Sequence, residues 1–441
     1  MWFRRDLRLA DNPALWAAAD QSAVVPLFVL DDHLRRPAGA NRMAFLYRAL
    51  RSLDYGLGGR LVVRAGDPTA IVPAVAAEAG AQRVVCAADF GPYGRRRDEA
   101  VAAALTAAGR GLQRVGSPYA VAPGTVVKAD GQPYQVFAAY YRQWQSRLDP
   151  ETAPLPRASW KTLPSDGVPK DPSIGAQLPE ASEAAARSRL DRFLEEGVTE
   201  YRIRRERPAD DGTSRLSPYL KFGLLHPDAV LSRLAAVGEP FRRQLAWRDF
   251  YADVLWHAPE SARRSWSPRM RELRADHGPD ADERFRAWAE GRTGYPLVDA
   301  GMRQLLAEGW MHNRVRMVTA SFLVKDLHLP WERGARHFLA QLVDGDLASN
   351  NHGWQWVAGT GTDAAPFTRI FNPVAQSRRW DPDGAYLRRY LPELADVKAP
   401  EIHEPWRLPG FPAPIVDHAE ERLDALARHG EASARSRRGA R

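Results

Sequence analysis

Residues 241–251, Phe241-Arg-Arg-Gln-Leu-Ala-Trp-Arg-Asp-Phe-Tyr251, form a segment whose polar and aromatic side chains recur at helical spacing. Positions i, i+3, i+4 and i+7 put four of them on one face: Gln244, Trp247, Arg248 and Tyr251. A face that only packed against a core would be aliphatic. An amide, a flat indole and a guanidinium together suit a planar heteroaromatic ligand with hydrogen-bonding edges.

Residues 310–322 form a second segment of the same kind. Asn313, Arg316 and Met317 share one face at helical spacing. Two helices with such similar stripes are explained most economically by a pocket that both help to line.

The run from Asp344 to Trp356 combines two carboxylates, two adjacent asparagines and two indoles with glycines that permit unusual backbone angles. It follows a predicted helix, so we expect a binding loop. Asp344, Asp346 and His352 could instead ligate a metal, although their spacing matches no known zinc or calcium pattern and we expect none. Asp344 and Asp346 could also form an acid–base pair, although their closeness in the chain does not show the separation that such a pair needs. A capped structural turn is the third alternative.

The composition is that of a soluble globular protein of two or three domains, with 44% apolar and 26% charged residues in a chain of 441. A net charge of +8 suits a polyanionic partner, but it is equally compatible with simple solubility. The one cysteine, Cys86, excludes a disulfide framework and lies in an apolar run, where we expect it to fill core. The sequence has no G-x-S-x-G motif, no signal peptide and no apolar stretch that could span a bilayer. We therefore expect a cytoplasmic protein that is no nucleophilic hydrolase and has no membrane association.

The first part of the chain alternates short β-branched runs with alanine-rich amphipathic segments, which predicts a doubly wound parallel sheet. Strands are expected over 24–30, 61–64 and 83–87, and helices over 42–57 and 69–78. Asp67 is expected to cap the second helix, with Pro68 in its first turn. This part contains neither a G-x-G-x-x-G motif nor a Walker loop.

Seven prolines between positions 150 and 179 predict an extended connector. Beyond it, the 3.6-residue period predicts helices over 181–196, 240–257, 297–308, 312–326 and 331–343. We therefore expect an α/β domain over 1–130, a linker over 131–180, an all-helical domain over 181–430 and a disordered basic tail over 431–441. Ten of the 14 tryptophans fall in the helical part, and a large aromatic core explains their number but not their position beside polar clusters.

Several of these segments resemble motifs of the photolyase/cryptochrome family, and most closely those of class I cyclobutane pyrimidine dimer photolyases. Six stretches between the first residues and about Trp406 carry the resemblance: Trp2–Leu9, Gly212–Ser217, Gly294–Asp299, Trp310–Phe322, Asp344–Trp356 and Gly361–Pro366. The resemblance implies an N-terminal α/β domain and a C-terminal helical domain that holds FAD in a folded shape. It implies an enzyme, a deoxyribodipyrimidine photo-lyase, whose excited reduced FAD passes an electron to a dimer flipped out of UV-damaged DNA and recovers it after the ring splits.

The resemblance also implies which residues hold the FAD. Phosphate and ribose contacts fall on Tyr201, Thr213, Ser214, Arg215, Leu216 and Ser217, and the rest of the cofactor on Gln244, Arg248, Asn313, Arg316, Asp344, Asp346 and Asn350. Arg316 paired with Asp344 would place a fixed positive group near the isoalloxazine. Asn350 could hydrogen-bond the flavin nitrogen that gains a proton on reduction. Together they would favour the reduced, anionic flavin.

A further set of residues matches the family's contacts with DNA and its electron supply. Trp247 and Trp356 match indoles that wedge the flipped dimer, and Asn313 and Met317 match its other contacts. The DNA backbone would be met by Arg205, Arg314 and Arg369. The chain that relays electrons to the flavin would consist of Trp354, Trp331 and Trp288.

Gln244 departs from the dimer-repairing class, which usually has Glu at this place. Glutamate could protonate or hydrogen-bond the carbonyls of the dimer, whereas glutamine supplies neither a proton nor a charge. Glutamine here is familiar from animal cryptochromes and (6-4) photolyases, but those relatives usually have His where this chain has Asn313 or Met317. We expect slower repair of the same lesion. A blue-light photoreceptor of the cryptochrome type and a (6-4) photolyase remain the alternatives.

The resemblance extends to a second, light-harvesting chromophore. The stretches Pro92–Asp98 and Leu220–Gly223 resemble the deazaflavin-binding subgroup, with contacts on Arg42, Asp98 and Lys221. We therefore expect 8-hydroxy-5-deazaflavin, with methenyltetrahydrofolate as the alternative. We expect a monomer without an obligate protein partner.

Overall fold

The computed structural model describes residues 1–20, 23–150 and 158–439. They fall into two compact units. The first unit comprises Met1–Ile174, Leu178–Thr199 and Ser214–Pro259, and the second comprises Gly175–Gln177, Glu200–Thr213 and Glu260–Arg441.

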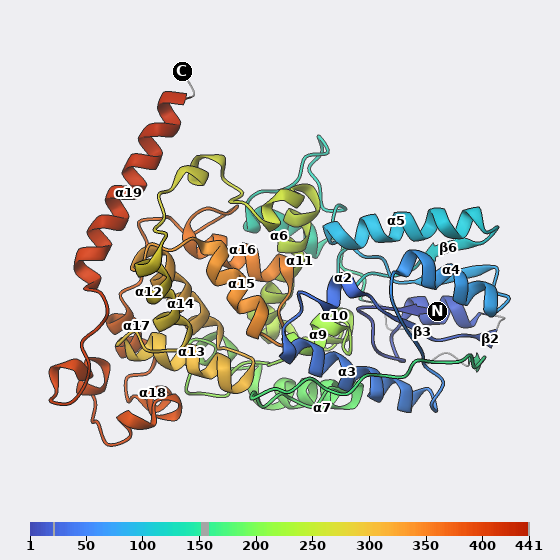
Figure 1. The fold of residues 1–441 in the computed structure, drawn as a ribbon, viewed down its shortest axis with the longest axis horizontal. Helices are drawn as coiled ribbons and strands as arrows, with labels where there is room; N and C mark the ends of the chain where they lie inside the picture. Colours follow the sequence, from blue (N-terminus) through green and yellow to red (C-terminus); the bar gives the residue numbers. More distant parts are fainter. Residues whose placement is uncertain (21–22, 151–157, 440–441) are drawn as a thin grey trace. The chain divides into compact units, whose positions relative to one another are not determined.

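The first unit is built on parallel strands with helices between them. Strands β1 (Trp2–Phe3), β3 (Leu27–Leu30) and β4 (Val62–Ala65) pair in the order β1-β3-β4, and β5 (Arg83–Cys86) pairs with β6 (Gly111–Arg114). The connecting helices are α1 (Pro13–Ala19), α2 (Asp32–Arg35), α3 (Ala40–Gly56), α4 (Pro68–Glu78) and α5 (Pro92–Ala107). Figure 1 shows α4 and α5 on one side of the strands and α3 on the other. The predicted α/β fold is confirmed, and Cys86 fills its core as expected.

A proline divides what the sequence predicts as one strand over 24–30. Pro26 has no N–H to donate to a ladder, and the chain instead forms β2 (Ala23–Val24) and β3 on either side of it. β2 pairs with β7 (Ser159–Trp160), which lies in the predicted linker. The linker also contains α6 (Phe137–Gln145), which buries Phe137, Tyr140, Tyr141 and Trp144.

Four helices of the first unit lie beyond the linker in sequence. They are α7 (Glu183–Arg192), α9 (Ser217–Phe222), α10 (Pro227–Leu231) and α11 (Glu239–His257). The sequence assigns this stretch to the helical domain, so compactness and sequence pattern divide the chain differently here. The predicted domain boundaries stay a prediction.

The described part of the second unit is helical and contains no strand. Its helices are α8 (Tyr201–Arg204), α12 (Pro279–Ala289), α13 (Pro296–Glu308), α14 (Asn313–Lys325), α15 (Trp331–Gln341), α16 (Leu347–Ala358), α17 (Pro373–Trp380), α18 (Ala385–Tyr390) and α19 (His418–Gly439). One apolar core joins α13, α14, α15 and α16 and includes Trp288, Phe322 and Phe338. The predicted all-helical part is confirmed. Within the described ranges no helix combines the length and the apolar character needed to cross a bilayer.

Two segments differ from their predicted local structure. The expected binding loop over 344–356 is mostly helix, because the Asp346 side chain accepts a hydrogen bond from Ser349 N (3.1 Å) and caps α16. The segment from 431 to 439, where we expect disorder, continues α19, since alanine, arginine and glutamate are strong helix formers. Residues 440–441 lie outside the described part.

Candidate functional site

An ion pair joins the start of α14 to the segment before α16. Arg316 Nη2 donates to Asp344 Oδ2 at 2.9 Å, and Arg316 Nε donates to Met311 O at 2.8 Å. Asp344 is only 8% exposed, so this pairing, which the sequence predicts, is shielded from water. A guanidinium held by a carboxylate on one side and a carbonyl on another keeps a fixed orientation.

The beginning of α16 has two adjacent side-chain amides. Asn350 Nδ2 donates to Ala335 O (3.1 Å) and to Asn351 Oδ1 (2.8 Å), and Asn351 Nδ2 donates to Ala262 O (2.6 Å). Asn351 is buried and Asn350 half-buried. Sequence reasoning assigned a role to Asn350 and missed Asn351, because its partner Ala262 lies 89 residues away.

His352 follows these amides and has both ring nitrogens engaged. Nδ1 lies 2.8 Å from Ala348 O and Nε2 lies 2.9 Å from Ser261 Oγ. Since a carbonyl can only accept, Nδ1 carries the proton and Nε2 accepts from the serine hydroxyl. Burial lowers the pKa of His352 to about 4. The imidazole is therefore neutral and committed to the fold, so the metal interpretation of Asp344, Asp346 and His352 loses its nitrogen ligand.

The three predicted relay tryptophans are buried in the second unit, with Trp354 3%, Trp331 5% and Trp288 0% exposed. The rings of Trp354 and Trp288 meet edge to face with centroids 6.1 Å apart. Trp331 Nε1 donates to Ser265 Oγ at 3.1 Å, and Trp288 Nε1 donates to Thr319 O at 3.0 Å. Trp354 Nε1 has no hydrogen-bond partner within the described residues.

Gly334 on α15 provides the space for Trp354. A Cβ at this position would collide with the far edge of the Trp354 ring. The next residue, Ala335, is the one whose carbonyl holds Asn350. The glycine therefore lets α15 and α16 approach closely at the point where the amide pair is anchored.

The predicted DNA-backbone arginines of the second unit differ in how tightly they are held. Arg314 donates to Glu206 (Nε to Oε2, 2.7 Å), and its guanidinium lies 4.8 Å from the ring centre of Trp380. Arg205 lies over the ring of Tyr201 at 5.4 Å. Arg369 is exposed, and its backbone carbonyl accepts from Lys325 Nζ at 3.0 Å.

Two predicted lesion contacts and one predicted lesion indole lie on the second unit. Asn313 is exposed at the start of α14, and its Nδ2 lies 3.8 Å from the sulfur of Met317, one turn later. Trp356 is partly buried against the core of this unit.

The face of α11 predicted to meet a planar ligand lies in the first unit, and its side chains are half-buried. The Trp247 ring stacks on Phe137 with centroids 3.8 Å apart and an interplanar angle of 10°. Arg248 donates to Pro118 O (2.9 Å) and to Leu220 O (3.2 Å). Gln244 Nε2 donates weakly, at 3.4 Å, to Pro240 O one turn earlier.

The opposite face of α11 carries two buried carboxylates that sequence reasoning missed. Asp249 accepts from Val121 N and Trp144 Nε1, each at 3.0 Å, and Asp253 accepts from Gly124 N at 2.7 Å. Burial raises the pKa of each to about 6. Their spacing of four residues was the available signal, because it places both on one helical face. They fix α11 against the segment before α6.

The predicted phosphate and ribose contacts fall in both units. Tyr201 and Thr213 belong to the second, and Ser214, Arg215, Leu216 and Ser217 belong to the first. Arg215 has φ +49°, an unusual value for a residue with a side chain. Ser214 O accepts from Arg189 Nε at 2.8 Å, which holds this turn against α7.

The predicted chromophore contacts of the first unit lie on separate helices. Asp98 on α5 is 2% exposed and is enclosed by Arg4 (2.5 Å) and Arg97 (2.9 Å). Arg42 lies on α3 and Lys221 on α9, both half-buried. Both arginines bind Asp98 Oδ1, and Asp98 Oδ2 has no hydrogen-bond partner among the described residues.

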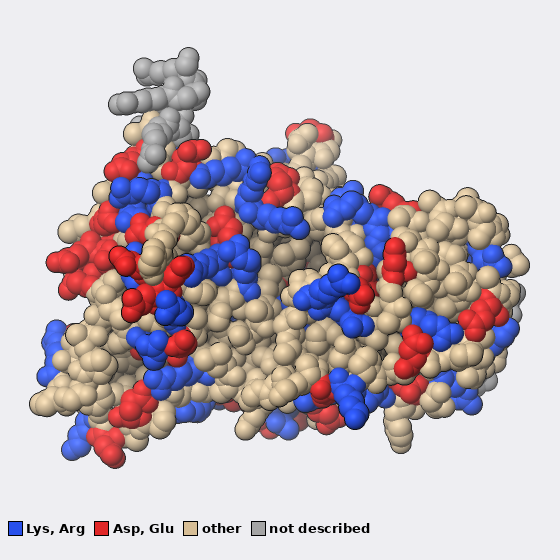
Figure 2. Space-filling model, in the orientation of Figure 1, with Lys and Arg blue, Asp and Glu red and all other residues tan. Residues whose placement is uncertain are grey.

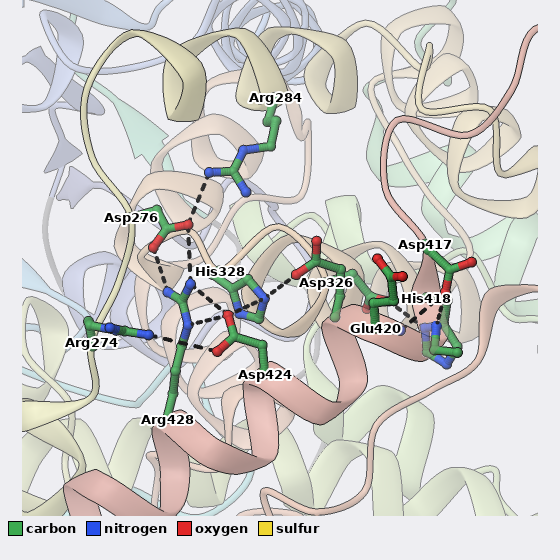
Figure 3. Close-up of polar contacts among 12 residues, drawn as sticks. Arg274, Asp276, Arg284, Asp326, His328, Asp417, His418, Glu420, Asp424 and Arg428 are labelled. Atoms are coloured by element: carbon green, nitrogen blue, oxygen red, sulfur yellow. Dashed lines mark hydrogen bonds and ion pairs between the residues drawn. The ribbon is translucent and has the colours of Figure 1, made fainter.

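A second polar cluster of the second unit joins α19 to the segments before α12 and α15. We call it the clasp, and it consists of Asp276, His328, Glu421, Asp424 and Arg428. All of these except Glu421 are labelled in Figure 3. His328, Glu421 and Asp424 lie close enough together to hold a metal ion. A cation is already there, because Arg428 donates to Asp424 Oδ2 (2.8 Å) and to Asp276 Oδ1 (2.5 Å). His328 Nε2 lies 2.6 Å from Glu421 Oε2. The guanidinium thus already pairs with Asp424, one of the three candidate metal ligands.

The charge distribution on one face of the molecule does not by itself locate a nucleic-acid interface. On the face drawn in Figure 2, Lys and Arg side chains are interspersed with Asp and Glu. The assignment of a function therefore depends on the buried geometry and on relatives.

Two family models match the chain in the order that the fold suggests. The model described as DNA photolyase matches residues 1–159, and the model described as the FAD binding domain of DNA photolyase matches residues 241–431. An α/β part followed by a helical FAD-binding part defines the class: a flavoprotein of the DNA photolyase type.

Individual relatives narrow this class. The chain is 44% identical to a deoxyribodipyrimidine photo-lyase of Streptomyces griseus, covering 95% of this chain and 96% of the relative. Among solved structures it is similar to a class III photolyase of Agrobacterium tumefaciens (TM-score 0.92, 35% identity, 98% and 97% coverage). It is also similar to a photolyase of Sulfolobus tokodaii with two FAD molecules (TM-score 0.86, 29% identity, 98% and 99% coverage). The chain belongs to the photolyase/cryptochrome family, as its motifs predict.

Proposed function

We propose that this enzyme uses light to repair cyclobutane pyrimidine dimers in DNA, with FAD as its cofactor. When bound and reduced, the FAD would supply one electron to the dimer on excitation and take it back after the ring has split. The observations that carry the proposal lie at the start of α16: a shielded Arg316–Asp344 pair just before the helix, and within its first residues an amide, Asn350, whose oxygen bonds to no described residue. They occur in the segment matched by the FAD-binding family model.

The residues of the second unit fit this cofactor chemically. Arg316 offers a permanent positive charge, which suits a reduced flavin that carries negative charge. Asn350 Oδ1 makes no hydrogen bond with any described residue and can accept one from a protonated ring nitrogen. Tyr201, Thr213, Asn313, Asp344 and Asp346 would complete the contacts of this unit, and Ser214, Arg215, Leu216, Ser217, Gln244 and Arg248 those of the first. These assignments stay predictions.

On the substrate side, aromatic side chains would receive a dimer that has left the duplex. A dimer stacks poorly, so extruding it costs less than extruding a normal base. Trp247, already stacked on Phe137, and Trp356 would flank the extruded dimer. Arg205, Arg314 and Arg369 would bind backbone phosphates and set the register without reading sequence.

The remaining expectations extend the proposal. Trp354, Trp331 and Trp288 would relay electrons to the flavin. The second chromophore would be 8-hydroxy-5-deazaflavin, with Asp98 Oδ2, which neither Arg4 nor Arg97 binds, as one candidate contact. Methenyltetrahydrofolate or a second FAD, as in the Sulfolobus tokodaii structure, are the alternatives. We expect the enzyme to act in the cytoplasm as a monomer.

One observation favours a second candidate function. Gln244 stands where a glutamate would assist the dimer, and its amide can supply no proton. A (6-4) photolyase or a cryptochrome-type photoreceptor would tolerate this residue.

Repair assays distinguish the three functions. Oligonucleotides with one cyclobutane thymine dimer, or with one (6-4) photoproduct, are incubated with the enzyme in light and in darkness. We expect restoration of the dimer substrate only, and only in light. Light-dependent restoration of the (6-4) substrate alone would assign the other lesion, and restoration of neither by protein with a normal flavin spectrum would favour the photoreceptor.

A further inference from the structure

Asn350 and Asn351 on α16 form a short chain of amide hydrogen bonds with a carbonyl at each end. One end is Ala335 O, which accepts from Asn350 Nδ2 at 3.1 Å. The other is Ala262 O, which accepts from Asn351 Nδ2 at 2.6 Å. In the middle, Asn350 Nδ2 donates to Asn351 Oδ1 at 2.8 Å.

The two carbonyls fix the direction of the whole chain. A backbone carbonyl can only accept, so the atom that faces it must be the amide nitrogen. Asn351 therefore turns its nitrogen to Ala262 and its oxygen to Asn350. Asn350 uses both of its N–H groups, one on Ala335 and one on Asn351. Its oxygen is the polar atom that remains available.

Two hydrogen bonds orient the Asn350 amide, one to Ala335 O and one to Asn351 Oδ1. Without Asn351, only the bond to Ala335 O would remain. A single hydrogen bond to Ala335 O at 3.1 Å would compete with rotation of the amide, and either its oxygen or its NH2 group could then face outward. Asn351 is 6% exposed and tied to Ala262, so it supplies a second contact of fixed polarity.

We propose that Asn351 is a positioning residue that makes Asn350 a fixed hydrogen-bond acceptor toward the flavin. This inference depends on the proposed function, in which Asn350 meets the ring nitrogen that is protonated only after reduction. A fixed acceptor pairs with that N–H in the reduced flavin and faces a lone pair in the oxidised flavin. Asn351 thus shifts the equilibrium of the bound cofactor toward the reduced form.

The test compares two buried amides of α16. Asn351→Leu removes the fixed partner of Asn350 at similar side-chain volume. Gln355→Met is the matched control, because Gln355 is fully buried and also ties α16 to the 261–266 segment, donating to Ser261 O (2.8 Å) and accepting from Trp266 N (2.7 Å). The Gln355 substitution leaves both partners of Asn350 in place.

The readout is the midpoint potential of the bound FAD, measured by spectroscopic redox titration together with the melting temperature. We expect both variants to melt at lower temperature. Only Asn351→Leu should lower the ratio of reduced to oxidised FAD at a given potential, roughly tenfold, or about 30 mV for a two-electron couple. In an Asn350→Ala background, Asn351→Leu should change the ratio of reduced to oxidised FAD at a given potential less than twofold, because Asn351 acts through Asn350.

Three results would overturn the inference. They are an unchanged potential in Asn351→Leu, an equal shift in Gln355→Met, and an equal shift in the Asn350→Ala background. If the leucine variant does not fold, Asn351→Ser, whose hydroxyl ends one bond short of the amide oxygen, is measured with the same expectation. Absence of FAD from the wild-type protein would instead refute the proposed function, so the two failures are distinguishable.

Discussion

The second unit contains two polar clusters that are similar in composition but differ in whether a polar atom remains available to a ligand. The clasp on α19 joins carboxylates, a histidine and an arginine, and Arg428 bridges Asp276 and Asp424. The cluster around α16 joins Arg316 with Asp344 and Asn350 with Asn351. In the clasp, the cations and carboxylates satisfy one another within the chain. Around α16, an oxygen of Asn350 is left over.

This difference separates a structural cluster from a functional one. Asn350 Oδ1 makes no hydrogen bond with a described residue and is available to a ligand, whereas the charged groups of the clasp already pair with one another. Residue types alone do not make the distinction, because the clasp has the better metal-ligand composition. The predictions below test it, beginning with the largest effect.

Replacing Arg316 by methionine should abolish FAD retention. The substitution leaves the carboxylate of Asp344, 8% exposed, without its guanidinium. Breaking a buried ion pair costs about 3–5 kcal/mol, equivalent to at least a roughly hundredfold loss of affinity if the cofactor depends on the pair. The absorbance ratio of FAD to protein after purification, and a titration with free FAD, measure it. Full retention would show that the cluster around α16 is structural, like the clasp.

Acidification should destabilise the protein through His352 more than through His328 of the clasp. The pKa of His352 is lowered from 6.5 to about 4 in the fold, so the unfolded chain binds the proton first as pH falls. Stability is therefore complete above about pH 6.5 and is lost toward pH 4, by about 2 kcal/mol at pH 5. The pKa of His328 is also lowered by burial and by Arg428, but Glu421 and Asp424 oppose this shift.

Urea unfolding of wild type, His352→Gln and His328→Gln at pH 7 and pH 5 measures this contrast. The difference in unfolding free energy between the two pH values should shrink most in His352→Gln. Equal pH dependence in the wild type and in His352→Gln would contradict the neutral, doubly hydrogen-bonded imidazole.

Replacing Arg428 by methionine should lower the free energy of unfolding by about 1–2 kcal/mol, because its partners are partly exposed and solvent screens the pairs. FAD content should not change. The arginines lower the pKa values of Asp276 and Asp424. Their stabilisation is thus present above about pH 4 and lost below it, and the difference between variant and wild type should narrow there. Loss of FAD from Arg428→Met would show that the clasp also supports cofactor binding. The distinction between a structural clasp and a functional cluster around α16 would then be wrong.

Replacing Gln244 by glutamate should have the smallest effect, a few-fold faster repair of a cyclobutane dimer per absorbed photon. The variant supplies the carboxyl group that the glutamine lacks. Trp247, on the same helix, provides the comparison, since Trp247→Ala should weaken binding of damaged DNA instead. Unchanged repair in Gln244→Glu would remove the reason to regard Gln244 as a handicap.

The sequence predicted what depends on local pattern and on long motifs. The parallel α/β part follows from short β-branched apolar runs that alternate with alanine-rich amphipathic segments, and the helical part follows from the 3.6-residue period. The cap of α4 by Asp67 is present, with its side chain accepting from Thr69 N at 2.9 Å. Among the predicted site residues, Arg316 and Asp344 are in contact.

The sequence could not predict features that depend on contacts between distant segments. Asn351 is positioned by its hydrogen bond to Ala262 O. The carboxylates of α11 are positioned by hydrogen bonds from backbone N–H groups more than 120 residues earlier in the chain. The loop predicted over 344–356 was wrong for a local reason. Asparagines and Gly353 disguised a helix whose signals were Asp346 before it and Gly359, in the left-handed region at φ +73°, after it.

Gly334 sets the spacing between α15 and α16, because it has a hydrogen atom where every other residue has a Cβ. Its missing Cβ lets the Trp354 ring lie against α15, and Ala335 beside it anchors Asn350. In a library of random substitutions, position 334 should therefore have one of the strictest size limits of the second unit, although no predicted site includes it. Attempts to raise stability by replacing glycines in helices with alanine should leave this one unchanged.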